Sequence, residues 1–161
     1  EKGKAIYGIC GGYQMMGTEI TDPNGVESDV ESIKGLGLLP VQTVLTDEKT
    51  TEQCEFKFKG SSESCKGYEI HMGETRSEEA SNLCVLTNGK FDGFYKDAKT
   101  WGSYIHGIFD NISVIREIVK VNGGNAVANF DLASFKDLQY DKLAQLVREN
   151  SNMDYIYSTL K

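Results

Sequence analysis

One short stretch near the start of the chain constrains the fold more than any other feature. Residues 6–12 read Ile-Tyr-Gly-Ile-Cys-Gly-Gly, and an amphipathic apolar segment up to residue 17 follows them. A short buried strand, a Gly-x-Cys-Gly-Gly turn and a helix in this order form the nucleophile-elbow pattern of α/β enzymes, with cysteine in place of serine. The sequence therefore predicts an α/β fold in which Cys10 lies at a sharp strand-to-helix turn.

The residues around Cys10 are of the types that a nucleophile requires. A sharp turn needs small residues two positions before and after the nucleophile, and Gly8 and Gly12 occupy these positions. A cysteine at a helix N-terminus lies near unpaired N–H groups and the positive end of the helix dipole, which favour the thiolate. The N–H of Gly11 is the nearest candidate donor to an oxyanion. A buried cysteine in a glycine-rich turn is the structural alternative.

A cysteine nucleophile needs a base, and the chain contains two histidines, His71 and His106. Each lies near the end of a strand-like run, where the catalytic groups of open α/β sheets gather. The pattern favours His106, because the adjacent Gly107 leaves space for a substrate. His71 stays open as a second candidate.

Composition and charge exclude several classes of function. The length of 161 residues fits one domain, and 39% apolar with 25% charged residues is typical of a globular protein. A net charge of −7 disfavours nucleic-acid partners and attachment by charge to anionic membranes. No apolar run approaches the ~20 residues that span a bilayer, so no membrane partner is expected.

The four cysteines lack metal-site and redox spacings. Cys10, Cys54, Cys65 and Cys84 form no C-x-x-C pair, so neither a metal site nor a redox dithiol is predicted. We expect reduced thiols in a cytoplasmic protein. A disulfide between Cys54 and Cys65 that closes a hairpin is the alternative.

Hydrophobic patterning divides the chain into a strand-rich part and a helical part. We expect solvated loops at 46–53 and 60–64 and a mostly parallel sheet with flanking helices and some antiparallel additions. The expected helices lie at about 112–122, 140–149 and 153–160, and their apolar stripes are expected to pack into a core. The expected strands are 5–9, 36–39, 41–45, 54–58, 68–72, 83–86, 91–95 and 103–105.

Three motifs carry a resemblance to a known family. Residues 8–17, 67–73 and 103–111, in this order, resemble the C-terminal amidotransferase domain of the cobyric acid synthase family, and residues 140–160 resemble its ending. The resemblance implies a class I glutamine amidotransferase with a flavodoxin- or Rossmann-like sheet. It implies that a Cys–His pair hydrolyses glutamine and that the ammonia passes to a synthetase domain of the same polypeptide. There, ATP with Mg²⁺ supports amidation of a corrinoid acceptor, adenosylcobyrinic acid a,c-diamide, in cobalamin biosynthesis.

The resemblance also assigns the nucleophile and the base, and it shows one difference from the wider class. It makes Cys10 the nucleophile, His106 the base and Gly11 an oxyanion donor. Many class I enzymes carry a glutamate two residues after the catalytic histidine, and Ile108 stands there. A dyad is therefore expected, with Glu69 as the candidate orienter of His106.

The resemblance assigns the binding of glutamine to two stretches. Gln14, one helical turn beyond the nucleophile, matches a position that contacts glutamine. Residues 71–73, His71, Met72 and Gly73, fall where related enzymes present backbone to the amino-acid end of the substrate. This makes His71 a binding or scaffolding residue under the resemblance.

The resemblance further implies that this chain is one part of a longer enzyme. We expect residues 1–161 to form a single domain, the C-terminal part of an amidotransferase domain whose earlier strands and second oxyanion donor precede it. No G-x-x-x-x-G-K-[ST] phosphate loop occurs here, so no cofactor is expected in this segment.

Other functions remain open at this point. One is an amidotransferase that serves another acceptor, a peptidoglycan precursor or cobyrinate. The others are a cysteine hydrolase and a catalytically silent binding module that retains the elbow. Selective reactivity of Cys10 over the other three thiols would separate the silent module from the enzymes.

Overall fold

The computed structural model describes residues 3–125 and 132–160. The chain falls into two compact units, Glu1–Val127 and Ala128–Lys161. The sequence-based expectation of a single domain stays a prediction. Among the described residues, none of the helices has the length and apolar character required to cross a membrane.

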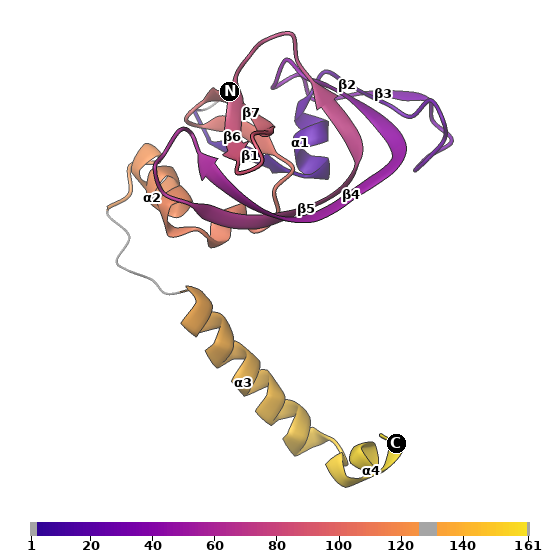
Figure 1. Cartoon of the computed structure of the whole chain (residues 1–161), viewed down its shortest axis with the longest axis vertical. Helices are drawn as coiled ribbons and strands as arrows, with labels where there is room; N and C mark the ends of the chain where they lie inside the picture. Colours follow the sequence, from indigo (N-terminus) through magenta and orange to yellow (C-terminus); the bar gives the residue numbers. More distant parts are fainter. Residues whose placement is uncertain (1–2, 126–131, 161) are drawn as a thin grey trace. The chain divides into compact units, whose positions relative to one another are not determined.

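The first unit is built on one eight-stranded sheet (Figure 1). The strands follow the order β1-β8-β7-β6-β4-β2-β3, and β5 pairs with β4 outside this path. Three helical segments accompany the sheet: α1 (Gly11–Met16), the 3₁₀ turn η1 (Ile108–Asp110) and α2 (Ile112–Val121). The strands are β1 (Ile6–Ile9), β2 (Glu19–Thr21), β3 (Ser32–Lys34), β4 (Gln42–Phe58), β5 (Cys65–Arg76), β6 (Asn82–Leu86), β7 (Phe91–Asp97) and β8 (Thr100–Ser103).

The predicted α/β class is confirmed, but the sheet is not mostly parallel. In the described part of the chain, only β1–β8 and β2–β4 pair in parallel. The pairs β2–β3, β4–β5, β4–β6, β6–β7 and β7–β8 are antiparallel. Short connections explain three of these pairs, because a parallel pair needs a crossover of about a dozen residues or more. Residues 59–64, 87–90 and 98–99, which join β4 to β5, β6 to β7 and β7 to β8, are too short for such crossovers.

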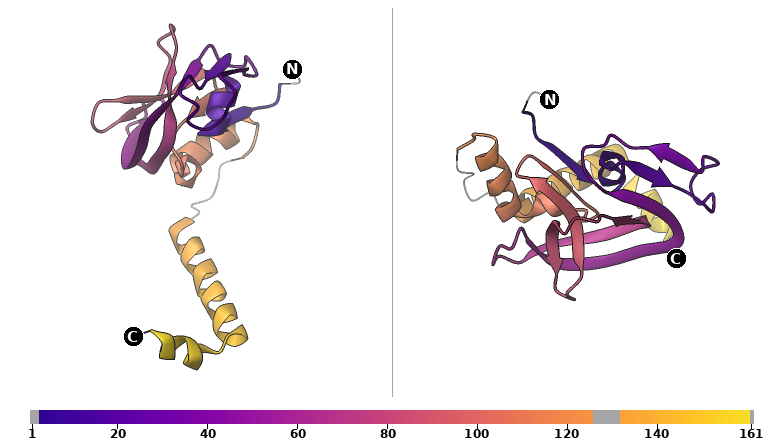
Figure 2. Two further views of the ribbon diagram at one scale, coloured as in Figure 1. Left: turned by 90° about the vertical axis from the view of Figure 1, so that its right-hand side faces the viewer. Right: turned by 90° about the horizontal axis from the view of Figure 1, so that it is seen from above.

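Strand β4 is longer than the sequence predicted. Its segment 46–53, expected to be a loop, is part of the strand, and β4 and β5 run side by side as a long curved ribbon (Figure 2). Most side chains in this segment are exposed, so backbone pairing tolerates its polar residues. The strand expected at 36–39 does not form, whereas the three-residue strands β2 and β3, too short to show a period, were missed.

Two clusters of buried apolar side chains form the core of the first unit. One joins Val114 of α2 to a group that includes Phe56 and Trp101. The other joins Tyr13 and Met16 of α1 to a group that includes Leu39, Val41, Phe94 and Tyr104. Helices α1 and α2 are thus anchored through separate clusters, and the chain segment that follows β8 contributes to both.

The second unit contains α3 (Leu132–Asn150) and α4 (Met153–Thr159). The helix expected at 140–149 is confirmed and is longer. The helix expected at 153–160 is confirmed too, and Asn152 caps it, since its side chain accepts a hydrogen bond from the Tyr155 N–H at 3.0 Å. Taken by itself, this unit leaves Leu143, Leu146 and Leu160 exposed, so the core packing predicted for these stripes is not found within it.

Candidate active site

Cys10 occupies a strained turn between β1 and α1. Its backbone dihedrals are φ 53° and ψ −118°, a conformation that costs a non-glycine residue about 1–3 kcal/mol. A Cβ atom on Gly8 would lie 2.8 Å from the carbonyl oxygen of Gly12 and 2.6 Å from Met16 Sδ. Only glycine therefore fits at this position, and the elbow predicted from the sequence is confirmed.

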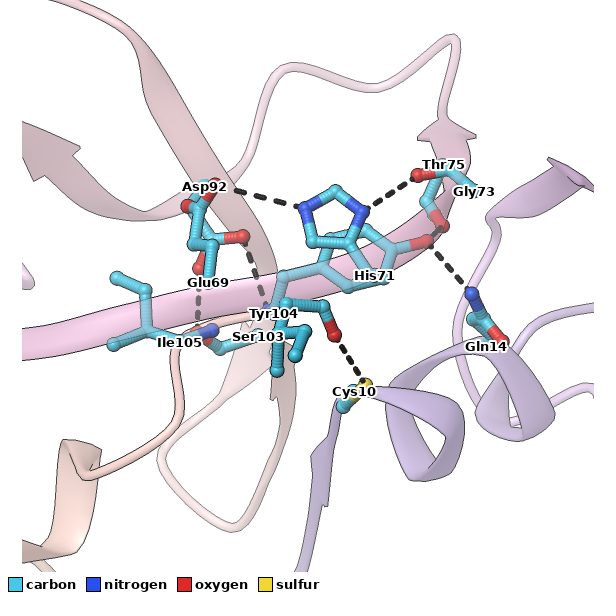
Figure 3. Close-up of polar contacts among 11 residues, drawn as sticks. Cys10, Gln14, Glu69, His71, Gly73, Thr75, Asp92, Ser103, Tyr104 and Ile105 are labelled. Atoms are coloured by element: carbon cyan, nitrogen blue, oxygen red, sulfur yellow. Dashed lines mark hydrogen bonds and ion pairs between the residues drawn. The ribbon is translucent and has the colours of Figure 1, made fainter. Parts of the chain in front are cut away.

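The backbone of Cys10 is tied to a strand and to a helix. Its N–H donates to the carbonyl oxygen of Ser103 at 2.9 Å, and its carbonyl accepts from Tyr13 and Gln14. Its half-buried Sγ lies 3.6 Å from the carbonyl oxygen of Ile70 in β5 (Figure 3). Gly11 is exposed and is the first residue of α1, where a backbone N–H has no acceptor within the helix. This N–H can donate to an oxyanion formed at Cys10.

The other three cysteines are buried free thiols. Burial raises the pKa of Cys54 to about 11 and also raises the pKa of Cys65 and Cys84. All four thiols are free, so the disulfide alternative is wrong. In the β4–β5 register Cys54 lies opposite Gly67, and Cys65 opposite Phe56. Among the cysteines, Cys10 is the accessible one.

His106 lies against the same strand as Cys10. Its backbone forms both hydrogen bonds of an antiparallel bridge with Tyr68, at 2.8 and 3.1 Å, and its ring stacks on the Tyr68 ring with centroids 5.0 Å apart. The bridge to Tyr68 lies two residues along β5 from Ile70, which contacts Cys10. Within the described part of the chain, His106 Nε2 is buried without a hydrogen-bond partner. An imidazole nitrogen in this state can accept a proton from a nearby thiol.

His71, in contrast, has a partner at each ring nitrogen. Nε2 lies 3.6 Å from Glu69 Oε2, and Nδ1 lies 3.0 Å from the carbonyl oxygen of Gly73. The ring also stacks on Tyr104, with centroids 3.8 Å apart. Side chains alternate along a strand, so Tyr68 and His71 point to opposite faces of β5. The carboxylate of Glu69 thus forms its ion pair with His71, although the sequence had suggested it as an orienter of His106.

The residues expected to contact glutamine converge next to Cys10. Gln14 Nε2 donates to Tyr104 Oη at 3.2 Å, and a Cβ atom on Gly73 would lie 2.8 Å from the same nitrogen. Tyr104 Oη also contacts Thr75 Oγ1 at 2.6 Å (Figure 3). Met72 is half-buried in β5 between His71 and Gly73. Of the predicted binding residues, Gln14 and His71 therefore contact the Tyr104 side chain, and Gly73 lies against the Gln14 amide.

Three residues of this site were missed in the sequence: Tyr104, Thr75 and Asp92. Tyr104 lies within the motif at residues 103–111. The signal that could have identified it is that the Gln14 amide needs a hydrogen-bond partner, which Tyr104 supplies. Asp92 is an acidic residue between the aromatic residues Phe91 and Phe94 of β7, and only 6% of it is exposed. Burial raises the pKa of Asp92 to about 6, against hydrogen bonds from Ser103 and Tyr104 that lower it.

Ile108 packs in the core, where many class I enzymes carry a glutamate at the matching position. It begins η1, and only 1% of it is exposed, in the cluster that contains Trp101 and Val114. The position therefore serves packing and offers no carboxylate to His106.

Comparisons with known proteins found a family model, named relatives and a solved structure that match this chain. A family model described as the CobB/CobQ-like glutamine amidotransferase domain matches residues 1–114. The chain is similar to the cobyric acid synthases of Parabacteroides distasonis (47% identical over 99% of this chain and 33% of the relative) and Phocaeicola vulgatus (44%, 99% and 33%). It thus spans about a third of the length of these relatives. A crystal structure of a glutamine amidotransferase matches with a TM-score of 0.48 at 16% identity, over 74% of this chain and 61% of that one.

Proposed function

Because the chain belongs to the CobB/CobQ-like glutamine amidotransferase domain family, we propose that its Cys10 and His106 hydrolyse glutamine and release ammonia. The observation that carries the proposal is the strained Cys10 turn at the start of α1. His106 takes the proton of the Cys10 thiol as Sγ attacks the side-chain amide carbon of glutamine, and Gly11 N–H donates to the oxyanion that forms. Ammonia leaves with a proton from His106. Water then attacks the γ-glutamyl thioester while His106 takes its proton, and His106 returns this proton to the departing Cys10 thiolate as glutamate is released.

His106 is the base in this proposal because its Nε2 is buried and unpartnered among the described residues. Both ring nitrogens of His71 already have partners, the Glu69 carboxylate and the Gly73 carbonyl. His71 therefore holds the strand that faces glutamine. With Ile108 in the core, the matching position offers no carboxylate, and in this proposal the reaction is assigned to a Cys–His dyad.

Gln14 and residues 71–73 bind the amino-acid part of glutamine in this proposal. Gln14 is held by Tyr104, and its amide lies against the Cα of Gly73. Tyr104 is in turn held by Thr75. This buried support fixes the amide and the strand backbone before glutamine arrives, which lowers the cost of ordering them on binding.

The acceptor of the ammonia follows from the relatives. Proteins named cobyric acid synthase are 44–47% identical over 99% of this chain. We therefore assign this chain to the glutaminase part of such an enzyme in cobalamin biosynthesis. A synthetase domain of the same polypeptide receives the ammonia and, with ATP and Mg²⁺, amidates the carboxylates of a corrinoid acceptor.

Labelling with a glutamine-mimicking diazoketone tests the proposed function. The 161-residue chain and the complete polypeptide that carries it are each incubated with the reagent, and adducts are mapped by mass spectrometry. We expect one adduct, on Cys10, that excess glutamine prevents. Cys54, Cys65 and Cys84 serve as internal controls, because their thiols are buried and have raised pKa values. No adduct in either protein, or labelling that glutamine does not prevent, would reject a glutaminase site.

Gly67→Ala is expected to reduce glutamine hydrolysis at least tenfold. The added Cβ would lie 2.4 Å from Ile105 Cγ2 and 2.6 Å from the carbonyl oxygen of His106, so the bridge that holds His106 must shift. A misplacement of about 1 Å costs about 10²-fold in rate. Glutamate release is the measurement, and Lys66→Ala, an exposed neighbour in β5, is the control. Wild-type turnover in a folded Gly67→Ala variant would show that the bridge does not position His106.

A further inference from the structure

The buried carboxylate of Asp92 accepts hydrogen bonds from Ser103 and Tyr104, in the segment that leads to His106. Asp92 Oδ2 accepts the Ser103 hydroxyl at 2.5 Å, and Oδ1 accepts the Tyr104 N–H at 3.1 Å (Figure 3). The Ser103 Oγ also accepts the Ile105 N–H at 3.0 Å. Asp92 and these three residues are all buried. Two side chains, those of Asp92 and Ser103, therefore hold the backbone N–H groups of Tyr104 and Ile105, the two residues before His106.

The Asp92 carboxylate binds the chain just beyond the point where the backbone pairing of β7 with β8 ends. Strands β7 and β8 pair up to Phe94 and Gly102 in the register, so Asp92 falls opposite Tyr104 just beyond the paired residues. Gly93, between Asp92 and Phe94, has a φ of +76°, and a Cβ there would lie 2.3 Å from the carbonyl oxygen of Gly102. Only glycine fits this position within β7. Strand β7 thus departs from regular β geometry at Gly93, next to the position where the Asp92 side chain, and not the β7 backbone, accepts the Tyr104 N–H.

Ser103 connects this carboxylate to the nucleophile as well. Its carbonyl oxygen accepts the N–H of Cys10 at 2.9 Å, while its hydroxyl is held by Asp92. One residue therefore links Cys10 at the end of β1 to the segment that leads to His106. Burying a carboxylate costs free energy of folding. Replacing a buried charged group and its partner by apolar residues of similar volume often leaves a protein no less stable.

We propose that Asp92, acting through Ser103, is a positioning residue for glutamine hydrolysis and sets His106 relative to Cys10. The inference rests on the proposed function above and extends it. Asp92 supplies, through the backbone, the orientation that a triad carboxylate would supply by direct contact. It reaches the base through hydrogen bonds to residues 103–105, which explains how the site functions with Ile108 in the core.

Kinetics of matched variants test this inference in the complete polypeptide that carries the chain. Asp92→Asn and Ser103→Ala are made singly and together, and Asp97→Asn, an exposed carboxylate in the same strand, is the control. Glutamate release gives kcat and KM, and exhaustive diazoketone labelling of Cys10 counts competent sites. We expect kcat per labelled site to fall about 10²-fold, as for a displacement of about 1 Å, with KM within twofold. The double variant should be no slower than the slower single variant.

The outcomes separate this inference from the proposed function. A wild-type protein that releases no glutamate rejects the proposed function itself. An active wild type whose folded variants keep full kcat per labelled site rejects only the positioning role, as does a change confined to KM. Where Asp92→Asn does not fold, Ser103→Ala, which removes one oxygen atom and adds none, decides the question.

Discussion

Cys10→Ser is expected to abolish glutamine-dependent turnover of the complete polypeptide while sparing turnover with free ammonia. The variant keeps the elbow geometry but replaces the thiol with a hydroxyl, which is a weaker nucleophile with a much higher pKa. Losing a catalytic nucleophile costs roughly 10⁴-fold or more in kcat. Ammonia supplied from solution bypasses this step, because it reaches the acceptor without glutamine hydrolysis. Product formation from each nitrogen source is the measurement.

Cys65→Ser is the matched control for this experiment. Cys65 is a buried free thiol that already contacts the Ser113 hydroxyl at 3.3 Å, so a serine there retains a hydrogen-bond partner. It should leave turnover with both nitrogen sources intact. If Cys10→Ser loses ammonia-dependent turnover as well, the role of Cys10 is structural. If it keeps glutamine-dependent turnover, another group is the nucleophile.

The elbow could be predicted from sequence because its constraints are local. A strained φ at the nucleophile and the close approach of Gly8 to Gly12 leave a contiguous pattern of small residues around Cys10. The amphipathic helix α2 was predictable for the same reason, since its apolar face repeats within ten residues. Features determined by neighbouring residues are visible in a sequence.

The sheet direction and the supports of the site were less predictable because they depend on distant residues. The resemblance to open α/β enzymes favoured parallel strands, but the short connections within the pairs β4–β5, β6–β7 and β7–β8 required hairpins. The partner of Glu69 was assigned to the wrong histidine, since alternation along β5 places Glu69 on the face of His71. Asp92 meets Ser103 across two strands, and no spacing rule identifies such a pair.

A comparison of the two histidines gives the second large effect. His106→Gln removes the only nitrogen of a described side chain that is buried without a hydrogen-bond partner, and therefore the proposed base. We expect kcat for glutamine hydrolysis to fall about 10³- to 10⁴-fold. This is the range expected when one residue that acts both as general base and as general acid is lost. Diazoketone labelling of Cys10 should slow in parallel, because the thiol is no longer deprotonated within the site.

His71→Gln is the matched variant, and its effect should fall on binding. His71 holds Gly73 and Glu69 and stacks on Tyr104, so its loss loosens the strand that faces glutamine but removes no proton acceptor from Cys10. We expect KM to rise about tenfold with kcat within a few-fold, the pattern of lost uniform binding. The opposite result, with kcat lost in His71→Gln and retained in His106→Gln, would exchange the roles of the two residues. It would also make Glu69, the partner of His71, the third member of a triad on the other face of β5.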